Sequence, residues 1–182
     1  MADALLGNVL RDVAADDELW ILGDVAMGDV TANLTLLNTL RPRRIVIVGG
    51  NHDRFHPAAT RGGAKQQRWR EQYRDTSGVD ELLVDNTTVP VDGQHVTVSH
   101  IPYRGTDRRS SVRRDGTVID DRFAPYRPVD DGGWLLCGHV HEKWRQSGRM
   151  INVGVDAWAG QPVSEHTIAE LTNALHEVSL DK

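Results

Sequence analysis

Residues 45–53 read IVIVGGNHD and hold the strongest structural signal in this chain. The run 45–48 is β-branched and continuous, which is typical of a strand covered on both faces. Gly49 and Gly50 then break the strand and let the backbone turn tightly. The polar residues 51–53 therefore follow directly on a buried strand, and we expect their side chains at the edge of a sheet.

Three further stretches repeat this arrangement of an apolar run followed by polar, metal-ligating side chains. They are Gly23-Asp24 after residues 19–22, Ser99-His100 after 96–98, and the GHVH of 138–141 after 134–137. Strand ends of one parallel or mixed sheet meet at one edge, so residues far apart in sequence can converge there. Carboxylate, amide oxygen and imidazole together suit Mn²⁺, Fe²⁺ and Zn²⁺. Two such ions about 3.5–4 Å apart cleave phosphate esters in many enzymes.

Hydrophobic periodicity along the chain predicts an α/β fold. Apolar residues at helical spacing predict helices over 2–14 and 31–40, and a last helix that begins at Ser164 and Glu165. The polar stretch 64–75 is also expected to be helical. Residues 82–99 predict a hairpin whose turn is Asp92-Gly93, and a second hairpin follows with its tip at Ser147-Gly148. Strands alternate with helices early and hairpins come later, which favours an α/β sandwich of two mixed sheets with helices outside.

Composition favours one globular domain over residues 1–182. The net charge of −5 argues against a protein that coats nucleic acid broadly. Cys137 is the single cysteine of the chain, so no internal disulfide can form and a cytoplasmic location is expected. We expect Cys137 to be a buried strand residue rather than a ligand or nucleophile. No apolar run approaches the roughly 18 residues that a membrane span needs.

Taken in order, GD, GNHD, H and GHVH resemble the motif series of the calcineurin-like metallophosphoesterases. That pattern is D-x-H, GD, GNH[DE], H and GHxH. The likeness extends to NVGVDAW at 152–158 and PVS at 162–164, which resembles a compact bacterial and phage branch of the family. It implies a four-layer αββα sandwich of two mixed sheets. The combination of GNHD with a downstream GHxH is more specific than either motif alone.

The opening D-x-H element of the family pattern is absent. Asp3 and Asp12 are followed two places on by Leu5 and Ala14 rather than by histidine. We therefore expect an N-terminally incomplete domain that lacks its first strand and the loop after it. A domain of the same fold that has lost catalysis is the alternative.

The resemblance also implies roles for single residues. Asp24 would bridge two metal ions, and one site would be completed by Asn51, His100 and His139. The other site would keep only Asp24 and His141 of its ligands. Two divalent ions among Mn, Fe, Zn and Mg are implied, with Mn favoured.

The catalytic pair implied by the resemblance is His52 and Asp53. His52 would protonate the leaving oxygen, and Asp53 would hold the imidazole ring. Arg104 follows His100 closely and could clamp a substrate phosphate with its guanidinium fork, or it could belong to a solvated loop.

The implied function is that of a metal-dependent phosphoesterase, a hydrolase of phosphate esters that uses a two-metal hydroxide mechanism. No cap domain is evident, so the open site admits nucleotides, nucleic-acid ends, small diesters or phosphoproteins, and phosphodiesters are favoured. The alternative is a truncated or non-catalytic domain of the same fold that serves as a binding scaffold. No membrane partner is expected, and the sequence leaves the oligomeric state open.

Overall fold

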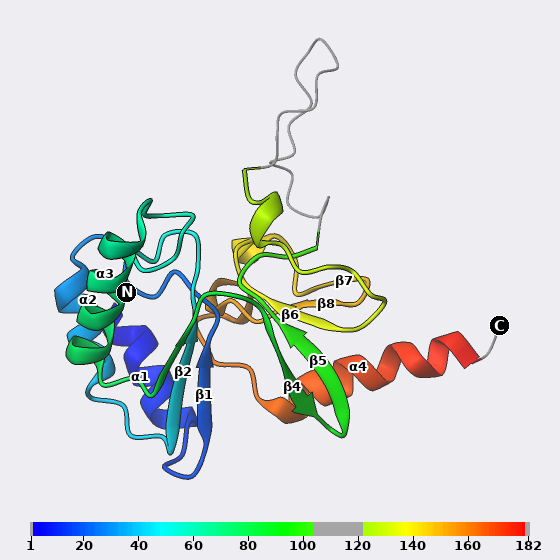
Figure 1. Ribbon diagram of the computed structural model, residues 1–182. Coiled ribbons are helices and arrows are strands. Elements are labelled where there is room, and N and C mark those ends of the chain that lie inside the picture. The colour runs from blue at the N-terminus through cyan, green and yellow to red at the C-terminus, as the bar shows by residue number, and fades with distance from the viewer. Residues whose placement is uncertain (1, 104–121, 181–182) are drawn as a thin grey trace.

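A computed structural model describes residues 2–103 and 122–180, with side chains described from residue 3 to residue 174 within those ranges (Figure 1). Arg104 lies outside the described residues. The first half of the chain builds a three-stranded sheet of order β1-β2-β3 whose pairs are all parallel. Its elements are α1 (Ala2–Asp12), β1 (Glu18–Ile21), α2 (Val30–Leu37), β2 (Arg44–Val48), α3 (Gly63–Ser77) and β3 (Glu81–Leu83).

The second half builds a five-stranded mixed sheet of order β4-β5-β6-β8-β7. The neighbours β5, β6 and β8 run parallel, and the pairs β4–β5 and β7–β8 are antiparallel hairpins. The strands are β4 (Thr87–Val91), β5 (Gln94–Val98), β6 (Leu135–Cys137), β7 (Gln146–Ser147) and β8 (Met150–Asn152). Three 3₁₀ helices, η1 (Ala124–Tyr126), η2 (His141–Lys143) and η3 (Val155–Trp158), and α4 (Glu165–Leu180) complete the described elements.

The expectation of two mixed sheets is half right, because the first sheet is parallel throughout its described strands. Each connection within it carries a helix, α2 between β1 and β2 and α3 between β2 and β3, and a helical crossover returns the chain in the same direction. The expected hairpin over 82–99 is also shorter than predicted. Asp92 and Gly93, with φ of 47° and 76°, form its turn between β4 and β5, whereas β3 joins the first sheet.

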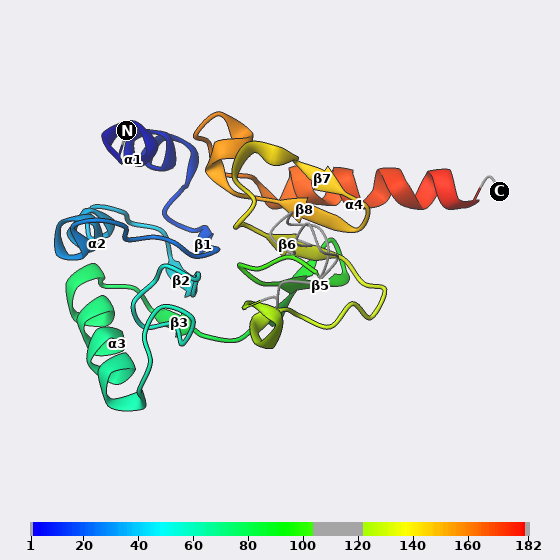
Figure 2. The same cartoon turned by 90° about the horizontal axis from the view of Figure 1, so that it is seen from above.

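The helices α1, α2 and α3 lie on the side of the first sheet that faces away from the second sheet (Figure 2). One apolar cluster fills the space between these helices and the sheet and includes the buried side chains of Leu34, Ile47 and Tyr73. Because side chains alternate along a strand, Val48 points the other way, into a cluster between the two sheets with Val98 and Ile151. The core therefore has two layers, one on each face of the first sheet.

The outer face of the second sheet has a smaller cluster of its own, made by Tyr103, Leu135, Cys137 and Met150. Cys137 is buried, as predicted, and burial raises the pKa of its thiol. A buried, protonated thiol is a packing group rather than a nucleophile. Ile168 of α4 belongs to the cluster between the sheets, so the last helix closes that layer.

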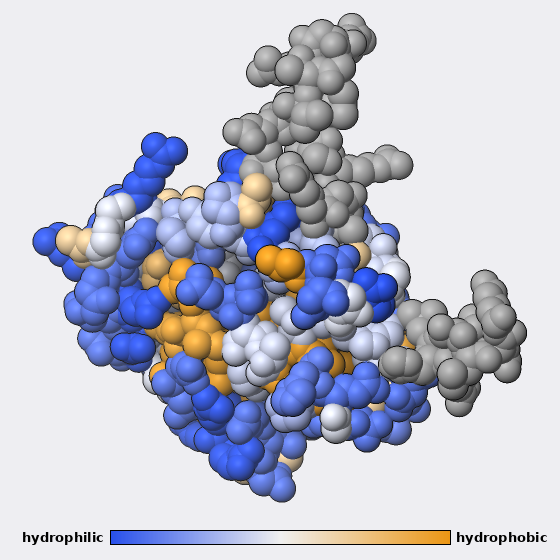
Figure 3. All heavy atoms as spheres, turned by 45° about the vertical axis from the view of Figure 1, so that its right-hand side comes forward, coloured by the Kyte–Doolittle hydropathy of each residue, from blue (hydrophilic) through white to orange (hydrophobic). Residues whose placement is uncertain are grey.

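Hydrophilic residues cover most of the face drawn in Figure 3, with apolar residues gathered in patches between them. Among the described residues, the large hydrophobic side chains that are most exposed are Leu10, Met27 and Val129. No helix in the described ranges combines the length and the apolar character that crossing a membrane requires.

Replacing Leu34 by alanine tests the layer between the helices and the first sheet. Leu34 is 0% exposed, so Leu34→Ala should lower the free energy of unfolding by about 2–5 kcal/mol in urea denaturation. Leu10→Ala is the matched control, because Leu10 is 51% exposed and its removal should cost less than about 1 kcal/mol. Equal losses in the two variants would contradict the assignment of this layer as core.

Candidate metal centre

Four of the predicted ligand residues follow four different strand ends and converge. Asp24 follows β1, Asn51 follows β2, His100 follows β5 and His139 follows β6. The Oδ1 atom of Asn51 lies 2.7 Å from Nδ1 of His139 and 3.1 Å from Nε2 of His100. Nε2 of His100 in turn lies 3.5 Å from Oδ2 of Asp24. The carboxyl ends of strands from both sheets thus bring one carboxylate, one amide oxygen and two imidazoles together.

This convergence depends on glycine at two strand ends. A Cβ atom on Gly23 would lie 2.5 Å from the Cα of Gly50 and 2.5 Å from Nδ1 of His100, which is closer than real Cβ atoms come. A Cβ atom on Gly50 would collide with the backbone and carboxylate of Asp24. Only a residue without a side chain lets the three loops approach this closely.

The hydrogen bonds of His100 decide which of its ring nitrogens carries the proton. Nδ1 lies 2.7 Å from the carbonyl oxygen of Leu22, and a carbonyl oxygen can only accept, so Nδ1 donates. In the neutral ring Nε2 is then an acceptor with a free lone pair. It faces two more acceptors, the side-chain oxygens of Asn51 and Asp24. His100 is 3% exposed and Asn51 is 7% exposed, so bulk water solvates these acceptors poorly.

The backbone at three of the predicted ligands has the left-handed conformation that side chains other than glycine rarely adopt. The φ angles are 55° at Asp24, 66° at His139 and 52° at His141. The remaining non-glycine residues with positive φ in the described part of the chain are Asp92 and Ala159. Such backbone conformations gather at functional sites, where the surrounding structure enforces them.

Asp53 is fully buried and bonds to backbone groups of both loops at the centre. Its Oδ2 accepts the N–H of Asp24 at 2.7 Å and that of Gly50 at 2.8 Å. Its Oδ1 accepts the N–H of Val25 at 3.1 Å and the hydroxyl of Tyr73 at 3.3 Å. Burial raises the pKa of the Asp53 carboxyl, and the N–H donors of Gly50 and Asp24 oppose that rise because they stabilise the ionised form.

The contacts of Asp53 correct the expectation that it holds the ring of His52. Both carboxylate oxygens are used by the loop that carries Asp24, by Gly50 and by Tyr73. His52 is exposed, and its backbone N–H donates to Oδ1 of Asp24 at 2.8 Å. Asp53 therefore positions the loops, and the backbone of His52 orients Asp24. The role of the His52 imidazole as an acid stays a prediction.

His139 and His141 are two residues apart, a spacing that would point both side chains the same way on an extended segment, but this segment is not extended. Val140 lies between them with φ −92° and ψ 4°, and its N–H donates to the carbonyl of Gly138 at 2.7 Å, so the segment turns. Nδ1 of His141 donates to, or accepts a proton from, Oδ2 of Asp156 at 2.8 Å. His141, Glu142 and Asp156 each place one potential ligand atom within 4.8 Å of the others, all exposed. The role of His141 as a metal ligand stays a prediction.

Three supporting residues had no role assigned from the sequence. The ring of Phe123 packs edge-on against His139, with centroids 5.1 Å apart. Nδ2 of Asn152 donates to the carbonyl oxygens of His141 and Trp144, which holds the loop after β6 in place. Tyr73 reaches Asp53 from α3. An aromatic or amide residue far away in sequence carries no pattern that could reveal such a contact.

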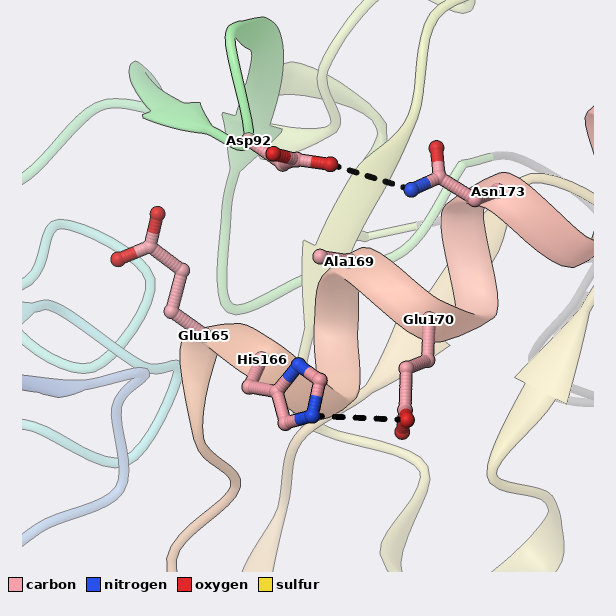
Figure 4. Close-up of a pocket in the computed structure, with 6 residues that line it drawn as sticks. All are labelled: Asp92, Glu165, His166, Ala169, Glu170 and Asn173. Atoms are coloured by element: carbon pink, nitrogen blue, oxygen red, sulfur yellow. Dashed lines mark hydrogen bonds and ion pairs between the residues drawn. The ribbon is translucent and has the colours of Figure 1, made fainter.

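A surface hollow of about 410 Å³ lies at the other end of the second sheet, between the β4–β5 turn and α4. In Figure 4, Asn173 of α4 donates a hydrogen bond to Asp92 of the β4–β5 turn, and His166 pairs with Glu170 along α4. The hollow is open and its polar groups bind one another. It contains none of the converging residues.

The chain is similar to proteins of two mycobacteriophages. It is 34% identical over 186 residues to the Gene 66 protein of Mycobacterium phage D29. That alignment covers 92% of this chain and 80% of the phage protein. The chain is 32% identical over 182 residues to the Gene 66 protein of Mycobacterium phage L5, which covers 96% and 83%.

A solved structure shares the fold. The crystal structure of a protein of unknown function from Aquifex aeolicus superposes with a TM-score of 0.59 and 24% sequence identity, over 93% of this chain and 84% of that one. This likeness concerns the mixed α/β fold alone. No protein-family model matches the chain.

Replacing Asp53 by asparagine separates a positioning role from a role on His52. An amide offers one acceptor where the carboxylate offers two, so backbone N–H groups of the Asp24 or Gly50 loop would lose their partner. Asp53→Asn should lower the free energy of unfolding by about 2–4 kcal/mol, measured in urea. Tyr73→Phe removes one neutral hydrogen bond to the same carboxylate and should cost about 0.5–1.5 kcal/mol. Unchanged stability of Asp53→Asn would show that the carboxylate does not hold the loops.

Proposed function

This chain belongs to the family of the mycobacteriophage Gene 66 proteins, and we propose that it is a metal-dependent phosphoesterase with the sandwich fold of the calcineurin-like enzymes. One observation carries the proposal. Oδ2 of Asp24, Oδ1 of Asn51 and, in the neutral ring, Nε2 of His100 face one another as acceptors, and Nδ1 of His139 donates to the same oxygen of Asn51 at 2.7 Å. A group of acceptors turned toward one another is stabilised by a cation placed between them.

The donor set fits a divalent transition metal. Carboxylate and amide oxygens combined with imidazole nitrogens suit Mn²⁺, Fe²⁺ and Zn²⁺ better than an all-oxygen set would. The carbonyl of Leu22 fixes His100 in the tautomer that exposes Nε2, which is the usual way in which a ligating histidine is oriented. We propose that Asp24, Asn51, His100 and His139 hold the ion. When bound, such an ion polarises a phosphoryl oxygen and activates water as a nucleophile.

The other groups of the centre serve position and proton transfer. The backbone N–H of His52 holds Oδ1 of Asp24, which leaves Oδ2 directed toward His100. Asp53 fixes the two loops that carry Asp24 and Asn51. The imidazole of His52 is exposed beside this centre, where it could give a proton to the leaving oxygen of a phosphate ester. Phosphodiesters are the favoured substrates of this proposal.

A non-catalytic metal-binding domain is the second candidate. The observation that favours it is the use of both Asp53 oxygens by the loops, since the His52 ring then has no support from that carboxylate. Such a domain would bind the ion without turning over an ester. A second ion at His141 stays a prediction under either candidate.

Metal titration tests the four proposed ligands. We expect isothermal titration with Mn²⁺ to show a bound ion, and His100→Ala or Asn51→Ala to weaken its binding at least about tenfold to hundredfold. His95→Ala is the matched control, since His95 is an exposed histidine of the same strand β5 and should leave the affinity unchanged. Equal affinity in His100→Ala and His95→Ala would rule out the proposed ligand set.

Turnover of phosphodiesters tests the role of His52. His52→Ala should bind Mn²⁺ as the wild type does and hydrolyse diesters with a basic leaving group about 10²–10⁴-fold more slowly. With p-nitrophenol as the leaving group the defect should shrink, because this group departs without a proton. Loss of the metal in His52→Ala would make His52 a ligand. A metal-loaded wild type that hydrolyses neither diester would favour the non-catalytic candidate.

A further inference from the structure

We infer that Arg54, Lys65 and Arg68, grouped around Trp69, form a contact surface for the phosphate backbone of a nucleic-acid strand. We call this surface the basic face of α3. It would deliver a nucleic-acid phosphodiester to the centre described above, and to that extent the inference rests on the proposed function. The binding itself depends only on the surface, so it can be tested separately.

Positive charge is concentrated in this part of the chain. Residues 54–74 contain six cationic side chains and one carboxylate, Glu71, in a chain whose net charge is −5. The cations are Arg54, Arg61, Lys65, Arg68, Arg70 and Arg74. When a protein of negative net charge carries its cations on one segment, that segment attracts a polyanion while the rest of the surface does not.

These six cations have no carboxylate partner among the described residues. The arginine ion pairs of the described chain use other side chains, namely Arg11, Arg43, Arg44 and Arg149. Glu71 accepts from the amide of Gln67 at 2.9 Å rather than from a neighbouring cation. The charge of the segment is therefore available to an anion from outside.

Packing fixes the position of Arg54. Its guanidinium carbon lies 4.7 Å from the ring centroid of Trp69, a cation–π contact that holds the side chain against α3. On α3, Lys65 lies four residues before Trp69 and three residues before Arg68, so it neighbours both on the helix surface. Arg54, Lys65 and Arg68 are exposed. Arg54 thus contacts the ring of Trp69, and Lys65 and Arg68 add two exposed cations on the same helix.

The basic face is tied to the candidate centre by covalent and hydrogen bonds. Arg54 directly follows Asp53, and its backbone N–H donates to the hydroxyl of Tyr73 at 3.3 Å. The same hydroxyl donates to Oδ1 of Asp53, which holds the loops that carry Asp24 and Asn51. The basic face and the candidate centre are therefore linked through Asp53 and Tyr73.

Nucleic acid fits this surface better than a lipid bilayer does. Helices that bind a membrane surface combine cations with exposed apolar side chains. The exposed large hydrophobic residues of the described chain are Leu10, Met27 and Val129, and none of them belongs to α3. Trp69, the aromatic side chain among these cations, is only partly exposed because it packs against the apolar core. Guanidinium groups pair well with phosphate oxygens.

Fluorescence anisotropy with a fluorescein-labelled single-stranded oligonucleotide tests the surface. The full chain is titrated in EDTA, so that no bound metal and no hydrolysis contribute. We expect the triple variant Arg54→Gln, Lys65→Gln, Arg68→Gln to bind roughly tenfold or more weakly at low salt. The slope of log affinity against log salt should become smaller by about 2, because each backbone contact to a single strand contributes about 0.7.

The matched control removes three cations elsewhere, Arg11→Gln, Arg43→Gln and Arg149→Gln, which changes the net charge by the same amount. It should bind the oligonucleotide as the wild type does, and equal thermal unfolding midpoints show that all three proteins are folded. Equal weakening in the two triple variants would assign the binding to net charge and overturn the inference. Absence of binding by the wild type, or tighter binding to phosphatidylserine vesicles, would also overturn it. Binding that depends on the basic face without any phosphoesterase turnover would refute the proposed function alone.

Discussion

The buried carboxylate of Asp53 is the constraint on which the rest of the centre depends. It accepts three backbone N–H groups from two loops that belong to different strands, and the hydroxyl of Tyr73 adds a fourth donor from α3. A buried charge is tolerated only when such donors surround it. The carboxylate therefore fixes the relative positions of the loop after β1, the turn after β2 and the helix that follows them.

The second sheet joins this arrangement through His100. Its Nδ1 donates to the carbonyl of Leu22, at the end of β1, and its Nε2 faces Asn51, at the end of β2. One imidazole thus links two strand ends of the first sheet to the end of β5. A Cβ atom on Gly23 would lie 2.5 Å from Nδ1 of His100, so glycine at this strand end is what lets His100 approach the first sheet so closely. The apolar cluster packs the two sheets against each other. His100 fixes the end of β5 beside the ends of β1 and β2.

The molecule has two groups of polar side chains that suit ligands of opposite charge. Acceptors are gathered at the strand ends, where a cation would stabilise them, and cations are gathered on α3, where an anion would. Asp53 and Tyr73 lie between the two and bond to each other. A phosphodiester carries negative charge along its backbone and needs a cation at the phosphorus that reacts. The proposed metal centre and the inferred basic face of α3 correspond to these two requirements.

Much of the fold follows from the sequence because its signals are local. The β-branched run 45–48 and the glycines after it predict β2 and the turn that carries Asn51, and the structure confirms that element. The apolar runs before Asp24, His100 and His139 likewise predict strands that the structure contains, and this places four ligand candidates at strand ends. Burial and turn formation depend on each residue and its near neighbours, so a single sequence reveals them.

Only the tertiary structure decides which atoms face one another. The alternation rule suggested that His139 and His141 point the same way, but left-handed backbone at both residues turns them apart, toward Asn51 and Asp156. The motif suggested that Asp53 serves the neighbouring His52, but its oxygens bond to loops that lie nearly thirty positions away and to Tyr73. The tautomer of His100 depends on the carbonyl of Leu22, which is distant in sequence. Hydrogen-bond partners are fixed by the packing of whole elements, and no local pattern of residues records that packing.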